Sequence, residues 1–154
     1  MPSDIVSREV RRRMMQSVRC ERTPIEMTVS SLLNKMGARH GRNVTSLPGS
    51  PDIANKSRRW AVFVHGCFWH GHANCKKTKG GPRGRIPIAN RAFWSEKIAA
   101  NRRRDARKAR SLREQGYRVL TVWECETKNV PGLNRKLTRF ADGLWSRGGH
   151  ASRR

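Results

Sequence analysis

Hydrophobic and polar positions follow a helical period early in the chain. Apolar side chains recur three or four positions apart after residue 24, at Ile25, Val29, Leu32, Leu33 and Met36. The stretch "TPIE" supplies Thr23 as a helix N-cap, Pro24 at the first helical position and Glu26 three residues after the cap. Gly37 follows as a typical helix end. The pattern predicts an amphipathic helix with one buried face.

Two strands are predicted next. "WAVFVHG" (residues 60–66) is almost wholly apolar, which is typical of a central strand covered on both faces. A shorter strand begins at Asp52, after the turn-rich "SLPGSPD" (residues 46–52), and "NKSRR" (residues 55–59) is a polar turn between the two strands. We therefore expect a β-hairpin that places Asp52 roughly opposite His65.

The second half predicts a long helix, a third strand and a final helix. The long helix runs from about Ala92 to Gln115, where Gly116 ends it. "YRVLTVWEC" (residues 117–125) is the third strand, and residues 133–144 again carry an apolar helical face. This order of elements predicts an α/β fold with a small central mixed β-sheet flanked by helices.

The chain has the length of one domain, which we expect to span residues 1–154. Within it, residues 1–19 form a basic N-terminal arm and residues 146–154 a frayed basic tail. No apolar run reaches the roughly 18 residues of a membrane span, and the N-terminus lacks the apolar core of a secretory signal. We expect a cytoplasmic protein.

The net charge of the chain narrows the class of molecule that it can bind. The chain carries 34 Lys and Arg against 11 Asp and Glu, a formal net charge of +23. Basic residues crowd residues 76–113, including a Gly- and Pro-rich loop at 76–90. Such an excess predicts a polyanionic partner, and we interpret that partner as nucleic acid. An anionic membrane is the weaker alternative, because no predicted helix has the bulky apolar face of an interfacial helix.

The stretch "HGCFWHGHANC" (residues 65–75) carries metal-ligand chemistry. Cys67, His72 and Cys75 are close enough in sequence to surround one ion, and Cys125 follows a strand that can lie beside the strand ending at Cys67. A Cys3His set predicts a closed, structural zinc site. The alternative is that Cys67 and Cys125 are small core residues at strand ends. Cys20 has no partner in this scheme.

A second centre is predicted at the same edge of the sheet. The hairpin brings together Asp52, a backbone carbonyl near the end of the strand, His65 and His70. This set suits metal-assisted phosphodiester hydrolysis, with Mg2+ held by oxygen ligands and a neutral imidazole as proton acceptor. The alternatives are that Asp52 is a turn residue and that both histidines are surface or supporting residues.

Two further groups allow two interpretations. Glu26 occupies a capping-box position, but it can also face a metal ion. Phe68 and Trp69 lie in the histidine-rich loop, and Trp94 opens the basic helix. These aromatic side chains suit insertion between bases or stacking on them, and the alternative is packing around the zinc site.

Four blocks in this order resemble the very-short-patch mismatch repair endonucleases: "SLPGSPD", "VFVHGCFWHGH", "FWSEKIAANRRRD" and "GYRVLTVWEC". The resemblance covers about residues 8–125. It implies a fold like that of the type II restriction endonucleases with an added structural zinc. It also implies an enzyme that nicks duplex DNA 5′ to the thymine of a T:G mismatch, the product of 5-methylcytosine deamination, and so initiates very short patch repair.

The resemblance assigns roles residue by residue. Asp52 resembles the magnesium-binding aspartate, and the backbone carbonyl of Val64 resembles the second protein ligand. His70 resembles the general base, His65 an assisting histidine, and Glu26 an acid reached through metal-bound water. The zinc set is implied to be Cys67, His72, Cys75 and Cys125, and the wedge beside the mismatch to be Phe68, Trp69 and Trp94.

This sequence also departs from the family pattern. A threonine is usual at the position of Val64, and the histidine run is interrupted by Gly71 and by residues 73–74. The basic loop at 76–90 is longer. The split of His70 and His72 between the two metal centres stays open at this point.

We therefore predict a Mg2+-dependent, zinc-stabilised, strand-specific DNA mismatch endonuclease. It is expected to act as a monomer in the bacterial cytoplasm, with repair-pathway proteins as further partners and no membrane association. One alternative is a nicking homing-type endonuclease with the same catalytic core, although 154 residues leave little room for an extra recognition domain. The other is a non-enzymatic, zinc-stabilised DNA-binding module.

Overall fold

The computed structural model describes residues 7–17, 23–72, 75 and 90–145. The elements are α1 (Arg8–Ser17), α2 (Pro24–Lys35), β1 (Gly41–Arg42), β2 (Ile53–Asn55), β3 (Trp60–His65), α3 (Arg91–Glu114), β4 (Arg118–Trp123), the short 3-10 helix η2 (Glu124–Lys128) and α4 (Val130–Trp145). Most of the expected arm forms α1. The rest of the arm, the loop at 76–89 and the tail at 146–154 lie outside the described residues.

The sheet has the order β1-β2-β3-β4. β1 and β2 are antiparallel, β2 and β3 form the predicted antiparallel hairpin, and β4 runs parallel to β3. The sheet is therefore mixed, as predicted, and β3 is its central strand. The two-residue β1 was not predicted, because two residues carry no readable periodicity.

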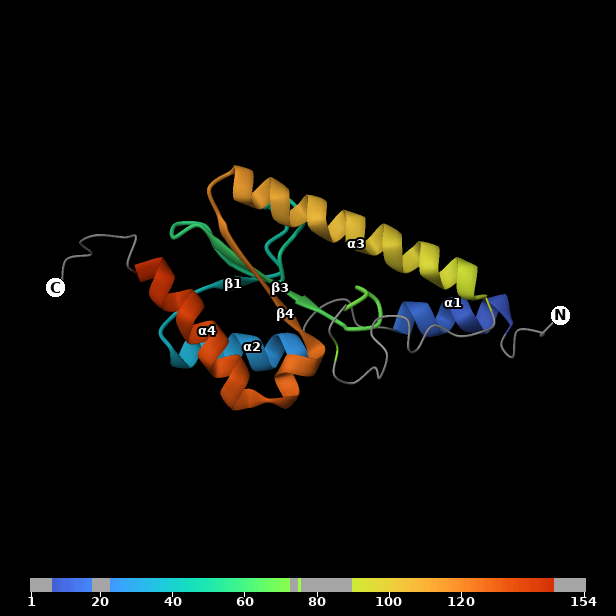
Figure 1. Cartoon of the computed structure of the whole chain (residues 1–154), viewed down its shortest axis with the longest axis horizontal. Coiled ribbons are helices and arrows are strands. Elements are labelled where there is room, and N and C mark those ends of the chain that lie inside the picture. Colours follow the sequence, from blue (N-terminus) through green and yellow to red (C-terminus); the bar gives the residue numbers. More distant parts are fainter. Residues whose placement is uncertain (1–6, 18–22, 73–74, 76–89, 146–154) are drawn as a thin grey trace.

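Helices cover both faces of this sheet (Figure 1). Alternate residues of β3 point to opposite faces. Trp60, Val62 and Val64 pack with α2 and α4, whereas Ala61 and Phe63 pack with Leu112 of α3. Every residue of β3 is buried, which explains its unbroken apolar sequence.

The helix ends match their sequence signals. Thr23 accepts a hydrogen bond from the Glu26 N–H and so caps α2, and Gly37 adopts a positive φ of 73° after the helix. Gly116, with φ 84°, reverses the chain between α3 and β4. The third strand is shorter than predicted: it ends at Trp123, and Cys125 lies in η2.

α3 is long enough to contact two parts of the molecule. At 24 residues it extends for about 36 Å, well beyond the sheet. Its C-terminal half packs on β4, and its N-terminal half passes the end of β3 (Figure 1). Side chains of α3 therefore reach the loop that follows β3. Within the described residues, no helix combines the length and apolarity needed to cross a membrane.

Candidate active site and Cys/His cluster

The candidate active site lies where β3 ends. Asp52 immediately precedes β2, and the hairpin register places it beside the last residues of β3. The Val64 N–H donates a hydrogen bond of 2.7 Å to Asp52 Oδ2. Burial raises the pKa of Asp52 to about 6, an effect that the bond from Val64 opposes and the nearby charge of Glu26 increases. The carboxylate is therefore costly to ionise here unless a cation joins it.

The backbone of Val64 faces the same side as Asp52. In the parallel β3–β4 ladder, the Arg118 N–H bonds to the Arg59 carbonyl, so β3 residues at odd positions pair with β4. Val64 stands at an even position, and its N–H and carbonyl both point away from β4. This register turns the Val64 carbonyl toward the side of β3 on which Asp52 lies.

The two predicted histidines lie against each other. The rings of His65 and His70 are stacked with centroids 4.0 Å apart and planes within 5° of parallel. His65 is 8% exposed, and burial followed by repulsion from His70 lowers its pKa to about 4. His65 is therefore neutral at physiological pH.

Asp105 joins this pair from α3, and the sequence reasoning missed it. His70 Nδ1 lies 2.5 Å from Asp105 Oδ2. Burial raises the pKa of Asp105, but the hydrogen bond and charge of His70 more than offset burial, so that its pKa lies below the ordinary value. An ionised carboxylate can only accept, so Nδ1–H of His70 donates to it, and in the neutral form of this ring the lone pair is on Nε2. The sequence signal that could have identified Asp105 is its position as a single acidic residue within an otherwise basic stretch of helix.

His65, His70 and Asp105 also place ligand atoms within 4.8 Å of one another. Metal-binding imidazoles direct their in-plane lone pairs at one ion. Two rings stacked in parallel cannot do so, and the Nδ1 of His70 is already committed to Asp105. The arrangement therefore favours a His–Asp proton-transfer pair over a metal site.

A cleft of about 660 Å³ opens over these groups. Glu26, 7% exposed, lines it from the first turn of α2, and Trp69 lines it from the loop after β3. Lys108 enters from α3, packed against Gly49, where an added Cβ would lie 2.6 Å from the Lys108 Cβ. The cleft is thus lined by four carboxylates, two imidazoles and two ammonium groups. Sequence reasoning also missed Lys108, because it is one cation among many on its helix.

The predicted zinc residues form a separate cluster. The ligand atoms of Cys67, His72, Cys75 and Cys125 all lie within 4.8 Å of one another. The Nδ1 of His72 is 3.6 Å from the Cys67 sulfur and 3.4 Å from the Cys125 sulfur. Tetrahedral zinc, with bonds of about 2.3 Å to sulfur and about 2.0 Å to nitrogen, separates such atoms by about 3.5 Å. The donor set and its spacing therefore fit one tetrahedral ion.

The protonation of this cluster also fits a cation. Burial and the neighbouring thiols raise the pKa of Cys67 to about 12, and burial and Cys75 help to raise that of Cys125. Several thiolates crowded in a buried site are unfavourable unless a metal ion compensates their charge. His72 is held by stacking on Trp123, with centroids 4.2 Å apart.

Gly71 lies between His70 and His72, which the sequence alone could not assign to one metal centre or the other. It adopts φ 61°, and a Cβ there would lie 2.6 Å from Ile98 Cγ2. The chain can therefore turn tightly beneath α3. This turn directs His70 toward Asp105 and His72 toward the cysteines.

The aromatic residues form a third group beside the cleft. Phe68, Trp69 and Trp94 contact one another with centroids 5.2 to 5.8 Å apart. Phe93, which the sequence reasoning did not select, contacts Trp94 and is 56% exposed. The Lys97 ammonium lies within 5.8 Å of three of these rings. The group presents flat apolar surface beside positive charge, the combination that stacks on nucleic-acid bases.

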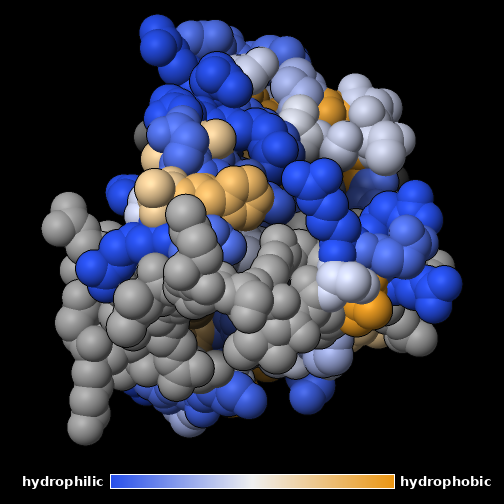
Figure 2. All heavy atoms as spheres, turned by 90° about the vertical axis from the view of Figure 1, so that its right-hand side faces the viewer, coloured by the Kyte–Doolittle hydropathy of each residue, from blue (hydrophilic) through white to orange (hydrophobic). Residues whose placement is uncertain are grey.

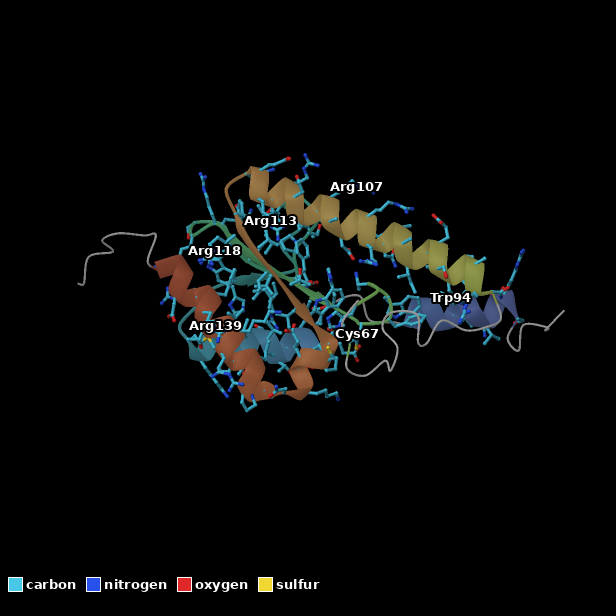
Figure 3. The ribbon with its side chains drawn as sticks, in the orientation of Figure 1. Cys67, Trp94, Arg107, Arg113, Arg118 and Arg139 are labelled. Atoms are coloured by element: carbon cyan, nitrogen blue, oxygen red, sulfur yellow. The ribbon has the colours of Figure 1, made fainter. Side chains whose placement is uncertain are left out.

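This end of the molecule is otherwise strongly hydrophilic. Figure 2 looks at the end where α3 begins and shows blue hydrophilic atoms over most of the described surface, with a small pale orange patch among them. Figure 3 shows Trp94 toward this end and Cys67 nearer the middle of the molecule. Trp69 contacts Trp94, lines the cleft and lies two residues after Cys67, so the aromatic residues, the cleft and the Cys/His cluster meet at the loop after β3.

Comparison with known proteins gives consistent results. A family model described as DNA mismatch endonuclease Vsr matches residues 3–77. A type II nicking enzyme of Xanthomonas oryzae pv. oryzae is 44% identical over 140 residues, which cover 91% of this chain and 98% of that protein. The DNA mismatch endonuclease Vsr of Escherichia coli is 38% identical over 123 residues, covering 80% of this chain and 74% of that protein.

Proposed function

This chain belongs to the Vsr family of DNA mismatch endonucleases, and we propose that it nicks one strand of duplex DNA 5′ to the thymine of a T:G mismatch. As a member of that family it is an endonuclease that acts on DNA. We place it in the bacterial cytoplasm, where it would act as a monomer on mismatches left by deamination of 5-methylcytosine. The nick would be the first step of very short patch repair.

The catalytic cleft supplies oxygen ligands for Mg2+. Asp52 and the Val64 carbonyl would bind the ion directly, and Glu26, which also lines the cleft, would bind it through water. When bound there, Mg2+ would polarise a phosphoryl oxygen and would stabilise the charge on the leaving 3′-oxygen. The raised pKa of Asp52, about 6, supports this assignment because a cation would favour its ionised form.

His70 carries the proton transfer in this proposal. Its Nε2 accepts a proton from water as the water oxygen bonds to phosphorus and the bond from phosphorus to the 3′-oxygen breaks. Asp105 holds the ring through Nδ1 and stabilises the imidazolium that forms. Neutral His65, stacked on His70, keeps this ring in place and adds no competing charge. The leaving 3′-oxygen takes a proton from solvent water, so the products are a 5′-phosphate and a 3′-hydroxyl.

Zinc in the Cys/His cluster would have a structural role. Cys67, His72, Cys75 and Cys125 leave no open position for substrate when they bind one tetrahedral ion. The cluster ties the loop after β3 to η2. We infer that it fixes the loop carrying His70 and Trp69, whose carbonyl accepts a 2.9 Å hydrogen bond from Asn101 of α3.

The aromatic group would select the mismatch. Phe68, Trp69 and Trp94 stand beside the cleft and can enter the base stack next to the scissile phosphate. A T:G wobble pair is unstacked more readily than a matched pair, so insertion costs less at a mismatch. This difference supplies the specificity in our proposal.

The observation that carries the proposal is the convergence of Asp52, His65, His70 and Asp105 at the end of β3. The test compares wild-type protein with Asp52→Asn on a T:G duplex and on a matched duplex, with Mg2+. We expect Asp52→Asn to lose about a thousandfold or more in nicking rate and to keep its affinity for the mismatched duplex. If the wild-type protein binds but does not cut the mismatched duplex under any divalent ion, the DNA-binding module is the better interpretation.

A further inference from the structure

A basic groove of about 750 Å³ follows the free edge of β4. We call it the β4 groove: it is bounded by Arg113 at the end of α3, by residues 117–120, and by residues 132–140 of α4. β4 is the last strand of the sheet, so its outer edge has no neighbouring strand. An unprotected edge is a ready site for an added strand.

The β4 groove is separate from the catalytic cleft. The two share no lining residue. Arg118 pairs with Trp60 at the start of β3, whereas the catalytic groups gather where β3 ends. In Figure 3, Arg113, Arg118 and Arg139 lie to the left of Cys67, and Trp94 lies farther to the right. DNA held in the catalytic cleft therefore does not account for this surface.

The charge of the β4 groove is largely uncompensated. Lys136 is neutralised by Glu126, whose carboxylate oxygens lie 2.8 Å away. Four arginines make no ion pair with any described residue: Arg113, Arg118, Arg135 and Arg139.

Arg118 is also held in position. Its guanidinium lies over the Phe140 ring at 5.4 Å and against Gly143, where a Cβ would collide with it. A fixed guanidinium favours a planar anion such as a carboxylate.

One residue of the free edge has both of its outward backbone groups open within the described part of the chain. Because the Arg118 N–H faces β3, the backbone groups of Val119, Thr121 and Trp123 face outward. The Thr121 carbonyl accepts a bond from Lys136, and the Trp123 N–H donates to Glu126. In the described part of the chain, no comparable bond reaches the outward N–H and carbonyl of Val119, which lines the β4 groove. One donor and one acceptor thus stand side by side above the arginines.

We propose that the β4 groove docks an acidic, extended segment of a partner protein. The segment would pair through its backbone with Val119 and place carboxylates against the four arginines. Apolar side chains that line the groove, including Tyr117 and Leu120, would receive its alternate apolar residues. This docking surface goes beyond the proposed nicking function and does not depend on it.

Two other occupants fit less well. A sugar–phosphate backbone has acceptors and no donor, so it would leave the Val119 carbonyl unsatisfied and place negative charge beside it. A second copy of this chain would bring 34 cationic residues against 11 acidic ones, and its surface would repel the groove. A polypeptide with acidic side chains would pair with the N–H and carbonyl of Val119 and would also neutralise the charge of the four arginines.

The test uses a fluorescein-labelled peptide of alternating glutamate and valine, about ten residues long, and follows its anisotropy with the full-length protein at physiological salt. Arg135→Glu combined with Arg139→Glu should weaken binding about tenfold. The matched control reverses two exposed charges elsewhere, Lys35→Glu with Arg39→Glu, and should change binding less than about twofold. Equal weakening by both double variants would mean non-specific attraction and would overturn the proposal.

Two further measurements separate strand pairing from simple charge. A peptide of equal charge with proline in place of every valine should bind more weakly, and amide exchange at Val119 should slow only with the glutamate–valine peptide. Equal binding of both peptides overturns the backbone pairing. The Arg135→Glu, Arg139→Glu protein should nick mismatched DNA at the wild-type rate. If instead it loses more DNA affinity than the control, the groove is a nucleic-acid contact and the proposal is wrong.

Discussion

The catalytic cleft and the Cys/His cluster are built from one short stretch of chain with opposite chemistry. The cluster gathers sulfur and one imidazole nitrogen in a largely buried position, with Cys67 and Cys75 no more than 9% exposed. The cleft gathers carboxylates, a carbonyl and two imidazoles beneath an opening of about 660 Å³. Soft donors in a closed site hold zinc permanently, whereas oxygen donors in an open cleft suit an exchangeable Mg2+.

The comparison teaches how two neighbouring histidines acquire different tasks. His70 and His72 are separated only by Gly71, and the turn at that glycine directs them to opposite centres. His70 receives a carboxylate partner, which leaves Nε2 free for a proton. His72 has its Nδ1 among thiols. The two regions therefore predict different consequences of mutation: folding should fail in one, and chemistry in the other.

The largest effect is expected from breaking the cluster. Cys67→Ser removes one of the four predicted zinc ligands. We expect wild-type protein to bind about one zinc ion per chain and the variant to bind none, and the free energy of unfolding should fall by about 3 kcal/mol or more. Metal analysis combined with denaturant unfolding measures both quantities. Cys20→Ser, outside the ligand set, is the matched control and should change neither. A Cys67→Ser protein that stays as stable as wild type without zinc would contradict the structural role.

The next largest effect is expected in the cleft, on the nicking rate and not on the stability of the fold. Asp105→Asn removes the anionic acceptor that orients His70, and kcat at saturating mismatched DNA should fall about a hundredfold. The Kd for DNA should stay within about twofold, because Asp105 contacts the histidine rather than the substrate. Glu114→Gln, at an exposed acid at the C-terminal end of the same helix, serves as the control. A parallel loss of DNA affinity would show that Asp105 supports the fold instead.

These contrasts also show what sequence could predict. The helix caps, the hairpin, the buried strand β3 and the grouping of Cys67, His72 and Cys75 depend on local spacing, which periodicity and turn residues encode. Cys125 joins them through the pairing of β3 with β4, an adjacency that the strand pattern predicts. The structure brings all four zinc residues together, and the hairpin places Asp52 beside Val64 as expected. The ligand and catalytic roles of these residues remain predictions.

The residues that sequence missed come from packing between distant elements. Asp105 and Lys108 reach the cleft only because α3 crosses the end of β3, a geometry set by side-chain packing against the sheet. The β4 groove needs α3, β4 and α4 at once. In a chain with 34 cations, no local signal distinguishes the few that line a particular cleft.

A pH titration tests whether Asp52 in the cleft binds Mg2+. Protons compete with Mg2+ for Asp52, whose pKa is raised to about 6 by burial, so apparent Mg2+ affinity should fall about tenfold per pH unit below pH 6. Calorimetric titration of Mg2+ at pH 5 and at pH 7.5 measures this, and Asp52→Asn should abolish the dependence. Equal affinity at both pH values would mean that Asp52 is not a ligand.

The free energy of unfolding of the metal-free protein should depend much less on pH over the same range than the Mg2+ affinity does. Asp52 has a folded pKa above its unfolded value, so its contribution is lost as pH rises from about 4 to 6. His65 has a folded pKa below its unfolded value, so the folded state gains stability as pH rises through nearly the same window. The two slopes have opposite signs and largely cancel. A steep stability change between pH 4 and 6 in wild type, but not in Asp52→Asn, would contradict this balance.

The smallest expected effect concerns the aromatic group that stands beside both regions. Phe93 is 56% exposed, so Phe93→Ala should cost less than about 0.5 kcal/mol of stability. Its ring contacts Trp94 and lies 5.8 Å from the Lys97 ammonium, at the edge of the group that we expect to meet the bases. We therefore expect Phe93→Ala to reduce the preference for T:G over T:A by about threefold, measured as a ratio of nicking rates. Trp69→Ala should reduce it further, because Trp69 lines the cleft itself. If both variants keep wild-type discrimination, the aromatic group serves packing around the zinc loop, and mismatch selection must come from another surface.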